Sequence, residues 1–286
     1  MRSILQAHAE AAARLTAAGV PSPEHDAWRL LEAASGLSRS TLLLTGASAV
    51  PEATAARLAG LVEERAARVP LQHVLGVAHF YGLELAVDAR VLVPRPETER
   101  LVELVLRELA DGLADAGPAP ATVLDVGTGS GAIALALKAE LTSAEVWGTD
   151  VSEDALAVAR GNAARLGLAV GFLRSDLLAD EEVAALARRA AVLAANLPYL
   201  PESDRVALQP EAAADPPGAL FAADGGLAIA ARLADQAWLT LPRGALLALE
   251  LDPRNVRGLA ERLSGWEGVR LEPDLAGRER FLLARR

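Results

Sequence analysis

Near its middle the chain reads Asp125-Val126-Gly127-Thr128-Gly129-Ser130-Gly131-Ala132. This segment follows a short apolar run at 122–124 and precedes a run at 133–141 whose apolar residues have helical spacing. Glycines at such a strand-to-helix junction let the backbone turn sharply and bring free amide groups close to a ligand. The segment therefore predicts an α/β fold with a ligand-binding loop at the carboxyl end of a central strand.

Strands and helices are predicted to alternate from this loop onward. Apolar residues at helical spacing predict four helices, at 133–141, 154–166, 228–239 and 254–263. Short apolar runs predict seven strands, at 122–124, 145–149, 170–173, 191–194, 245–251, 269–271 and 281–283. Because repeated strand–helix–strand units form parallel sheets, we expect a doubly wound, mostly parallel, seven-stranded sheet.

The N-terminal part of the chain has a different pattern. Apolar residues recur at helical spacing through residues 1–68, with Gly and Pro breaks between them, which predicts a small all-α domain. Residues 69–95 contain short β-like runs punctuated by glycine and are expected to form a β-hairpin linker. The predicted organisation is therefore a helical domain (1–68), a linker (69–95) and an α/β domain (96–286).

Composition excludes several classes of function. The 286 residues include no cysteine, which excludes thiolate nucleophiles and Cys-based metal sites. All four histidines lie within the first 79 residues, so neither a Ser-His-Asp triad nor a His-rich metal site can be built within the α/β domain, and we expect no metal. A net charge of −10 argues against an extended nucleic-acid surface.

The same sequence shows no apolar stretch of the ~20 residues that a membrane span needs, and no signal-peptide pattern. We therefore expect a soluble, cytoplasmic protein that does not associate with membranes. No exposed coiled-coil pattern is present, so a monomer is expected.

Three acidic residues are predicted to lie near the glycine-rich loop. Asp150, at the end of the next strand, suits the two ribose hydroxyls of an adenosine group. Asp125 suits an ammonium group and would be unfavourable beside a pyrophosphate. Asp176 follows the third strand, where an adenine amino group needs an acceptor, and Leu177 can pack on the adenine ring. These details favour S-adenosylmethionine, although the loop pattern alone also fits a dinucleotide.

The predicted cofactor-binding residues comprise the loop, these acids and one residue after the fourth strand. They are Asp125, Gly127, Thr128, Gly129, Ser130, Gly131, Asp150, Asp176, Leu177 and Asn196.

After the fourth predicted strand the chain reads Asn196-Leu197-Pro198-Tyr199. The Asn196 side-chain oxygen and the Leu197 backbone carbonyl are two acceptors that can hold an NH2 group, and Tyr199 offers a stacking face. Two acceptors on one NH2 group can align its nitrogen lone pair with a methyl carbon carried on a sulfonium. The sequence therefore predicts methyl transfer to nitrogen, with Asn196 and Tyr199 as the catalytic residues.

These residues resemble the amino-methyltransferases whose fourth motif reads Asn-Pro-Pro-Tyr or a close variant. Within that group, nearly the whole chain resembles the peptide chain release factor N(5)-glutamine methyltransferases. The segments that carry this resemblance are Arg68-Val69-Pro70-Leu71-Gln72, Phe80-Tyr81-Gly82-Leu83, Pro94-Arg95-Pro96-Glu97-Thr98-Glu99, Asp224-Gly225-Gly226-Leu227 and Asp274-Leu275-Ala276-Gly277-Arg278. The chain departs from the family at Leu197, where proline is usual, but Pro198 still biases Leu197 toward an extended backbone.

The resemblance implies a class I, Rossmann-like methyltransferase that uses S-adenosylmethionine. It implies that the substrate is the glutamine side-chain amide in the Gly-Gly-Gln loop of release factors, and that the helical domain recognises these proteins. The substrate-binding residues that it implies are Asn196, Leu197, Pro198, Tyr199, Phe80, Pro94, Arg95, Pro96 and Glu97.

Two other functions stay open at this point. Asn-Leu-Pro-Tyr also resembles the motif of ribosomal RNA adenine dimethyltransferases, so a nucleic-acid adenine N6-methyltransferase is the main alternative. Such enzymes would have a basic face and a domain after the catalytic one, whereas this chain is acidic and has its helical domain first. A nicotinamide-dependent oxidoreductase or a non-catalytic nucleotide-binding module fits the glycine loop alone.

Overall fold

The N-terminal part of the chain forms five helices that share one apolar core. They are α1 (Ile4–Ala17), α2 (Pro23–Ser35), α3 (Arg39–Leu44), α4 (Glu52–Ala66) and α5 (Leu71–Leu75). Ser3 and Gln6 form a capping box that satisfies free amides at the start of α1. Leu15, Leu30 and Leu31 are among the core side chains, and each is at most 1% exposed. The predicted all-α region is therefore observed.

The computed structural model describes residues 2–112 and 121–286, which fall into two units. One unit extends to Val77 and also includes Gln209–Ala214, and the other comprises Ala78–Leu208 and Asp215–Arg286. The helical unit thus extends past the expected boundary at residue 68. It also takes in the short helix α10 (Pro210–Ala213), which the sequence analysis assigned to the α/β domain.

Charged side chains hold this distant segment in the helical unit. Arg65, at the end of α4, donates to Asp26 at 2.8 Å and to Glu211 at 2.9 Å. Arg68 donates to both oxygens of Glu211 at 2.6 Å. These hydrogen bonds, that of Arg68 above all, lower the pKa of Glu211 to about 2. The sequence alone gave no sign of this pairing because Glu211 lies more than 140 residues from both arginines.

The second unit begins with a hairpin inside the predicted linker. Its strands, β1 (Val77–Phe80) and β2 (Leu83–Ala86), pair as a two-stranded sheet. Tyr81 and Gly82 connect them with φ values of 47° and 75°. Two successive residues of positive φ make the type of tight turn that matches the twist of paired strands.

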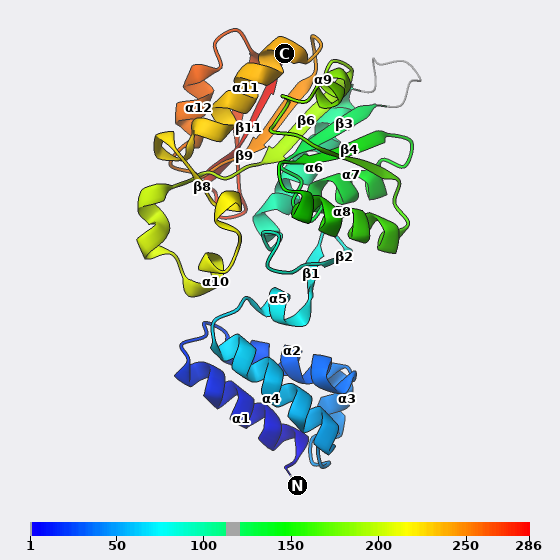
Figure 1. Ribbon diagram of the computed structural model, residues 1–286, viewed down its shortest axis with the longest axis vertical. Coiled ribbons are helices and arrows are strands. Elements are labelled where there is room, and N and C mark those ends of the chain that lie inside the picture. The colour runs from blue at the N-terminus through cyan, green and yellow to red at the C-terminus, as the bar shows by residue number, and fades with distance from the viewer. Residues whose placement is uncertain (1, 113–120) are drawn as a thin grey trace. The chain divides into compact units, whose positions relative to one another are not determined.

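The second unit is built on a seven-stranded sheet of order β10-β11-β9-β6-β3-β4-β5 (Figure 1). Its strands are β3 (Thr122–Val126), β4 (Glu145–Asp150), β5 (Val170–Arg174), β6 (Ala190–Asn196), β9 (Leu246–Glu250), β10 (Glu267–Pro273) and β11 (Glu279–Arg285). Five of these strands, from β9 to β5 in the sheet order, are parallel, and β11 runs antiparallel to both of its neighbours. The predicted seven-stranded, mostly parallel sheet is confirmed.

Helices cover both faces of this sheet. One layer consists of α6 (Pro96–Gly112), α7 (Ala132–Glu140) and α8 (Glu153–Leu166), and the other of α9 (Glu181–Ala187), α11 (Ala228–Thr240) and α12 (Val256–Arg262). Strand β6 contributes side chains to the cores on both faces of the sheet: Val192 and Ala194 belong to one core, and Leu193 and Ala195 belong to the other. Burial on both faces explains why the parallel strands read as continuous apolar runs.

Short elements connect β6 to α11. They are β7 (Leu200–Pro201), β8 (Phe221–Ala222), which pairs with β7, and three short 3-10 helices at Glu202–Ala207, Pro217–Ala219 and Asp224–Gly226. Among the described residues, none of the helices combines the length and the apolar character needed to cross a membrane.

Replacing Arg65 with methionine should destabilise the helical unit. The substitution keeps the apolar stem but leaves Asp26, which is 5% exposed, without its cation. Losing one partner of a buried ion pair costs about 3–5 kcal/mol. We expect the thermal unfolding transition of this unit to move to clearly lower temperature. Arg57→Met, on the exposed side of α4, is the matched control, and an equal effect of the two substitutions would contradict the account.

Candidate active site

The glycine-rich loop joins β3 to α7 at the carboxyl edge of the sheet. Gly127, Gly129 and Gly131 have φ values of 75°, 54° and 86°, which lie in the left-handed region that favours glycine. The backbone amides of Gly127 and Thr128 both donate to the Thr149 carbonyl at 2.8 Å. The loop is therefore fixed to the end of β4.

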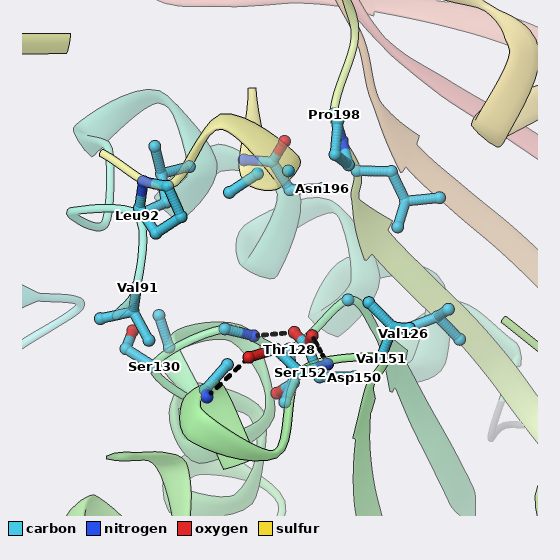
Figure 2. Close-up of a pocket in the computed structure, with 18 of the residues that line it drawn as sticks. Val91, Leu92, Val126, Thr128, Ser130, Asp150, Val151, Ser152, Asn196 and Pro198 are labelled. Carbon is cyan, nitrogen blue, oxygen red and sulfur yellow. Dashed lines mark hydrogen bonds between the residues drawn. The ribbon is translucent and has the colours of Figure 1, made fainter. Parts of the chain in front are cut away.

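Asp150, the last residue of β4, is held by two backbone amides, as the dashed lines in Figure 2 show. Gly129 donates to its Oδ2 at 3.0 Å and Ser152 donates to its Oδ1 at 2.9 Å. Burial raises the pKa of Asp150. Each carboxylate oxygen keeps a further lone pair, so Asp150 can accept hydrogen bonds from a ligand.

Asp150 and the loop form one wall of a cavity of about 400 Å³ in the second unit (Figure 2). The segment 90–95, the end of β5, the turn after β6 and residues 216–219 form the other walls. Thirteen of the residues predicted for the site line the cavity: Phe80, Pro94, Arg95, Gly127, Thr128, Gly129, Ser130, Asp150, Asp176, Leu177, Asn196, Leu197 and Pro198. Five others do not line it: Asp125, Gly131, Pro96, Glu97 and Tyr199.

Asp125 lies behind the loop rather than in the cavity. Its Oδ2 accepts hydrogen bonds from the Thr128 hydroxyl at 2.6 Å and from the Ala134 amide at 3.1 Å. The residue is fully buried, and this burial raises its pKa to about 7. In the structure Asp125 thus ties the loop to the first turn of α7, and its Oδ1 accepts no hydrogen bond from the described residues. The expected contact of Asp125 with an ammonium group stays a prediction.

The adenine end of the predicted site is more open. Asp176 is exposed and pairs with Arg232 of α11, whose guanidinium nitrogens lie 2.5 and 3.1 Å from its two oxygens. Leu177 lines the cavity with a φ of 57°, an unusual value for a residue with a side chain. Its side chain is buried, so it offers an apolar surface beside Asp176.

Asn196, at the carboxyl end of β6, donates from its Nδ2 to the Thr98 hydroxyl at 2.9 Å. Thr98 lies in the first turn of α6, is 4% exposed and also lines the cavity. Asn196 Oδ1 accepts no hydrogen bond from any residue that the structure describes, so this oxygen is available to a ligand. Sequence reasoning identified Asn196 but missed Thr98, which is 98 residues away.

The two residues after Asn196 line the cavity, but Tyr199 does not. Leu197 is buried and packs on the glycine loop, where a Cβ on Gly127 would lie 2.7 Å from Leu197 Cδ2. The charges of Glu250 and Arg280 act on the Tyr199 hydroxyl, and burial raises its pKa. Tyr199 therefore lies near Glu250 at the end of β9, and its expected stacking role stays a prediction.

Two residues that were not among the predicted site residues contact the turn after Asn196. The Asn255 side chain donates to the Tyr199 carbonyl at 3.1 Å. Gly226, with a φ of 97°, packs so closely that a Cβ at this position would lie 2.0 Å from the same carbonyl. Gly226 belongs to the Asp-Gly-Gly segment noted in the sequence, whose contact could not be inferred without the fold.

Asp215 positions the opposite wall. It is 2% exposed and accepts from the Arg95 guanidinium at 2.5 Å and from the Val93 amide at 3.3 Å. Asp215 therefore joins the predicted Pro-Arg-Pro segment to the residues at 216–219 that also line the cavity. No three His, Cys, Asp or Glu side chains within residues 2–112 and 121–286 are grouped so as to hold a metal ion.

Comparison with known proteins gives matches in both parts of the chain. Residues 6–76 match the model of the PrmC N-terminal domain, and residues 123–214 match a methyltransferase domain. A release factor glutamine methyltransferase from Deinococcus radiodurans is 48% identical over 97% of this chain and 96% of its own. One from Moorella thermoacetica is 38% identical over 99% of each chain.

Solved structures share the fold of the second unit. The human METTL16 catalytic domain in complex with MAT2A 3′UTR hairpin 1 has a TM-score of 0.56 and 16% identity, and the match covers 85% of this chain and 84% of that one. The N-terminal domain of human METTL16 in complex with SAH has a TM-score of 0.51, 17% identity and coverage of 72% and 76%. At this identity the likeness concerns the fold alone.

Gly226→Ala should disturb the turn that carries Asn196, because the new Cβ cannot fit beside the Tyr199 carbonyl. Gly225→Ala is the control, since Gly225 also has a positive φ but nothing lies within 4 Å of its Cβ position. Both substitutions carry a backbone penalty of about 1–2 kcal/mol. We expect Gly226→Ala to lower the melting temperature distinctly more, and equal melting temperatures would show that the close approach is unimportant.

Proposed function

The chain belongs to the release factor glutamine methyltransferase family, and we propose that it methylates the side-chain amide nitrogen of the glutamine in the Gly-Gly-Gln loop of peptide chain release factors. The methyl donor is S-adenosylmethionine. The observation that carries the proposal is that one cavity is lined by both the loop with Asp150 and by Asn196 with Leu197. A donor and an amide can therefore meet in one cavity.

The residues of the cavity fit the donor. A volume of about 400 Å³ lies within the ~300–1,000 Å³ range of small-molecule sites. Asp150 has two oxygens fixed by backbone amides, which suits the two ribose hydroxyls, and Leu177 beside Asp176 suits the adenine ring. When bound, S-adenosylmethionine supplies an electrophilic methyl carbon on a positively charged sulfur. The contribution of the chain is to hold both reactants in line.

Asn196 and Leu197 are the residues that would hold the glutamine amide. Asn196 Oδ1 and the Leu197 carbonyl would each accept one proton of the NH2 group, and this fixes the direction of the nitrogen lone pair. The amide nitrogen is a weak base and becomes acidic only as its bond to carbon forms. The two acceptors can hold its protons until the new bond to carbon has formed, and one proton would then pass to water, so a strong base is not needed at the start of the step.

The helical unit, including residues 1–68, would recognise the release factor. The family model matched by residues 6–76 supports this assignment. We propose that the protein acts as a monomer in the cytoplasm, where translation termination takes place. An RNA substrate is less well supported, because the curated relatives are named for release factors and the chain carries a net charge of −10.

Asn196→Ala should abolish most of the methyl transfer. Loss of one positioned polar group costs roughly 10²–10³-fold in turnover, while binding of S-adenosylmethionine should be nearly unchanged because Asp150 and the loop are intact. The assay follows a labelled methyl group from the donor into a purified release factor, with mass spectrometry to locate it on the glutamine.

Ribosomal RNA is the control acceptor in the same assay. Label that enters RNA and not the release factor would refute the proposed substrate. Full turnover by Asn196→Ala, with the label on the expected glutamine, would refute the role of Asn196 alone.

Asp150→Asn should weaken donor binding roughly 10- to 100-fold, the range for loss of a hydrogen bond to a charged group. Asp176→Asn is the matched comparison and should have a smaller effect, because Asp176 is exposed and already paired with Arg232. Calorimetric titration of S-adenosylmethionine into each variant measures the dissociation constants. The ribose assignment fails if Asp150→Asn binds as tightly as the wild type.

A further inference from the structure

Two buried side chains, Thr98 and Glu250, lie close to Asn196. The first is Thr98, whose hydroxyl accepts the Asn196 NH2 group at 2.9 Å. Thr98 is fixed in turn, because its backbone amide donates to the Arg95 carbonyl at 3.0 Å and its side chain is 4% exposed. A hydroxyl that accepts from Asn196 has its own proton left to donate, and a buried donor needs an acceptor.

The second side chain is Glu250, whose carboxylate is an acceptor close to Thr98. It ends β9 and is the register partner of Asn196 on the neighbouring parallel strand. Glu250 is 2% exposed, and neither of its oxygens accepts a hydrogen bond of good geometry from any of the described residues. Burial raises the pKa of Glu250 to about 7, and the nearby Thr98 hydroxyl opposes this rise.

The charged and titratable groups that face Glu250 come from each element packed around it. Arg280 of β11 and Arg95 before α6 favour the ionised carboxyl, whereas Glu97 in the first turn of α6 disfavours it. Tyr199, in the turn after β6, is a further neighbour, and the Glu250 charge helps to keep its hydroxyl protonated.

We propose that Thr98 and Glu250 are positioning residues that fix the orientation of the Asn196 carboxamide for the reaction. This inference rests on the proposed function of Asn196. Ionised Glu250 accepts a hydrogen bond from the Thr98 hydroxyl. The Thr98 oxygen then accepts a hydrogen bond from Asn196 Nδ2, and Asn196 Oδ1 is left for the substrate. In the reverse orientation Asn196 would present its own NH2 group to the NH2 group of the glutamine, and two donors cannot bind each other.

The arrangement makes turnover depend on the ionisation of Glu250. A protonated carboxyl can donate to Thr98, whose hydroxyl is then free to donate to Asn196 Oδ1. The Asn196 carboxamide can then rotate so that its oxygen and nitrogen exchange positions. Since the pKa of Glu250 is about 7, turnover should fall as the pH is lowered through neutrality. Donor binding should not follow this fall, because Asp150 and the glycine loop are not part of the pair.

Three substitutions test the pair, with kcat measured at saturating donor and release factor. Thr98→Val removes the hydroxyl at nearly constant volume and should lower kcat about 10- to 100-fold, as expected when a reacting group is misplaced. Thr98→Ser restores the hydroxyl and should recover most of that loss. Thr122→Val is the control, since Thr122 is a buried, hydrogen-bonded threonine at the opposite end of the sheet and should leave kcat unchanged.

Glu250→Gln tests the role of ionisation. The wild type should show a loss of kcat below about pH 7 that the glutamine variant lacks. Asp125, whose pKa is also about 7, is present in both proteins, so the difference assigns the titration to Glu250. Wild-type kcat in Thr98→Val, or an unchanged acid limb in Glu250→Gln, would overturn the proposal.

An NMR measurement on the enzyme without substrate tests the roles of Thr98 and Glu250 independently of the proposed function. In ¹⁵N NMR spectra the side-chain NH2 signals of Asn196 should shift with an apparent pKa near 7 in the wild type and should be independent of pH in Glu250→Gln. Signals that titrate equally in both proteins would refute the pair even if methyl transfer is observed. Absence of methyl transfer by the wild type, with the expected NMR behaviour, would instead refute the substrate assignment.

Discussion

Five parallel strands end at one edge of the sheet, and the site depends on the alignment of those ends. The register pairs Val126 with Thr149 on one side and with Ala195 on the other, and it pairs Asn196 with Glu250. Neighbouring strands lie about 4.8 Å apart, so the loop after β3, the end of β4 and the end of β6 necessarily adjoin one cavity. A one-residue slip would turn each side chain to the opposite face. The two helical layers that fix the register therefore also fix the site.

The loop and the residues proposed to hold the amide are also coupled by direct packing. Leu197 replaces the proline that is usual in related motifs, and its side chain needs space beside the loop. Gly127 provides that space, because any Cβ there would collide with Leu197 Cδ2. Gly226 provides the corresponding space beneath the Tyr199 carbonyl. The altered motif thus keeps its position through two glycines, one on each side of the turn.

The sequence predicted the parts of the site that are encoded locally. The glycine loop, Asp150 and Asn196 each follow an apolar strand, so their position at the carboxyl edge could be inferred. Contacts between distant segments could not: Thr98 meets Asn196 across 98 residues, and Glu211 joins the helical unit across more than 140. The contacts of Asp125 could not be predicted from the sequence either. Thr128 and Ala134 donate hydrogen bonds to one of its oxygens, and the sequence motif does not reveal this. The acid at the end of the apolar strand Leu246–Glu250 was a visible signal that the sequence analysis did not use.

The most direct test of the account is a crystal structure of the protein with S-adenosylmethionine and a release factor whose target nitrogen has been made unreactive. The distances to measure are those from the target amide to Asn196 Oδ1, to the Leu197 carbonyl and to the methyl carbon. The account predicts two hydrogen bonds of about 3 Å and a methyl carbon in line with the nitrogen, with the ribose on Asp150. An adenosyl group bound away from Asp150, or a glutamine that does not contact Asn196, would contradict it.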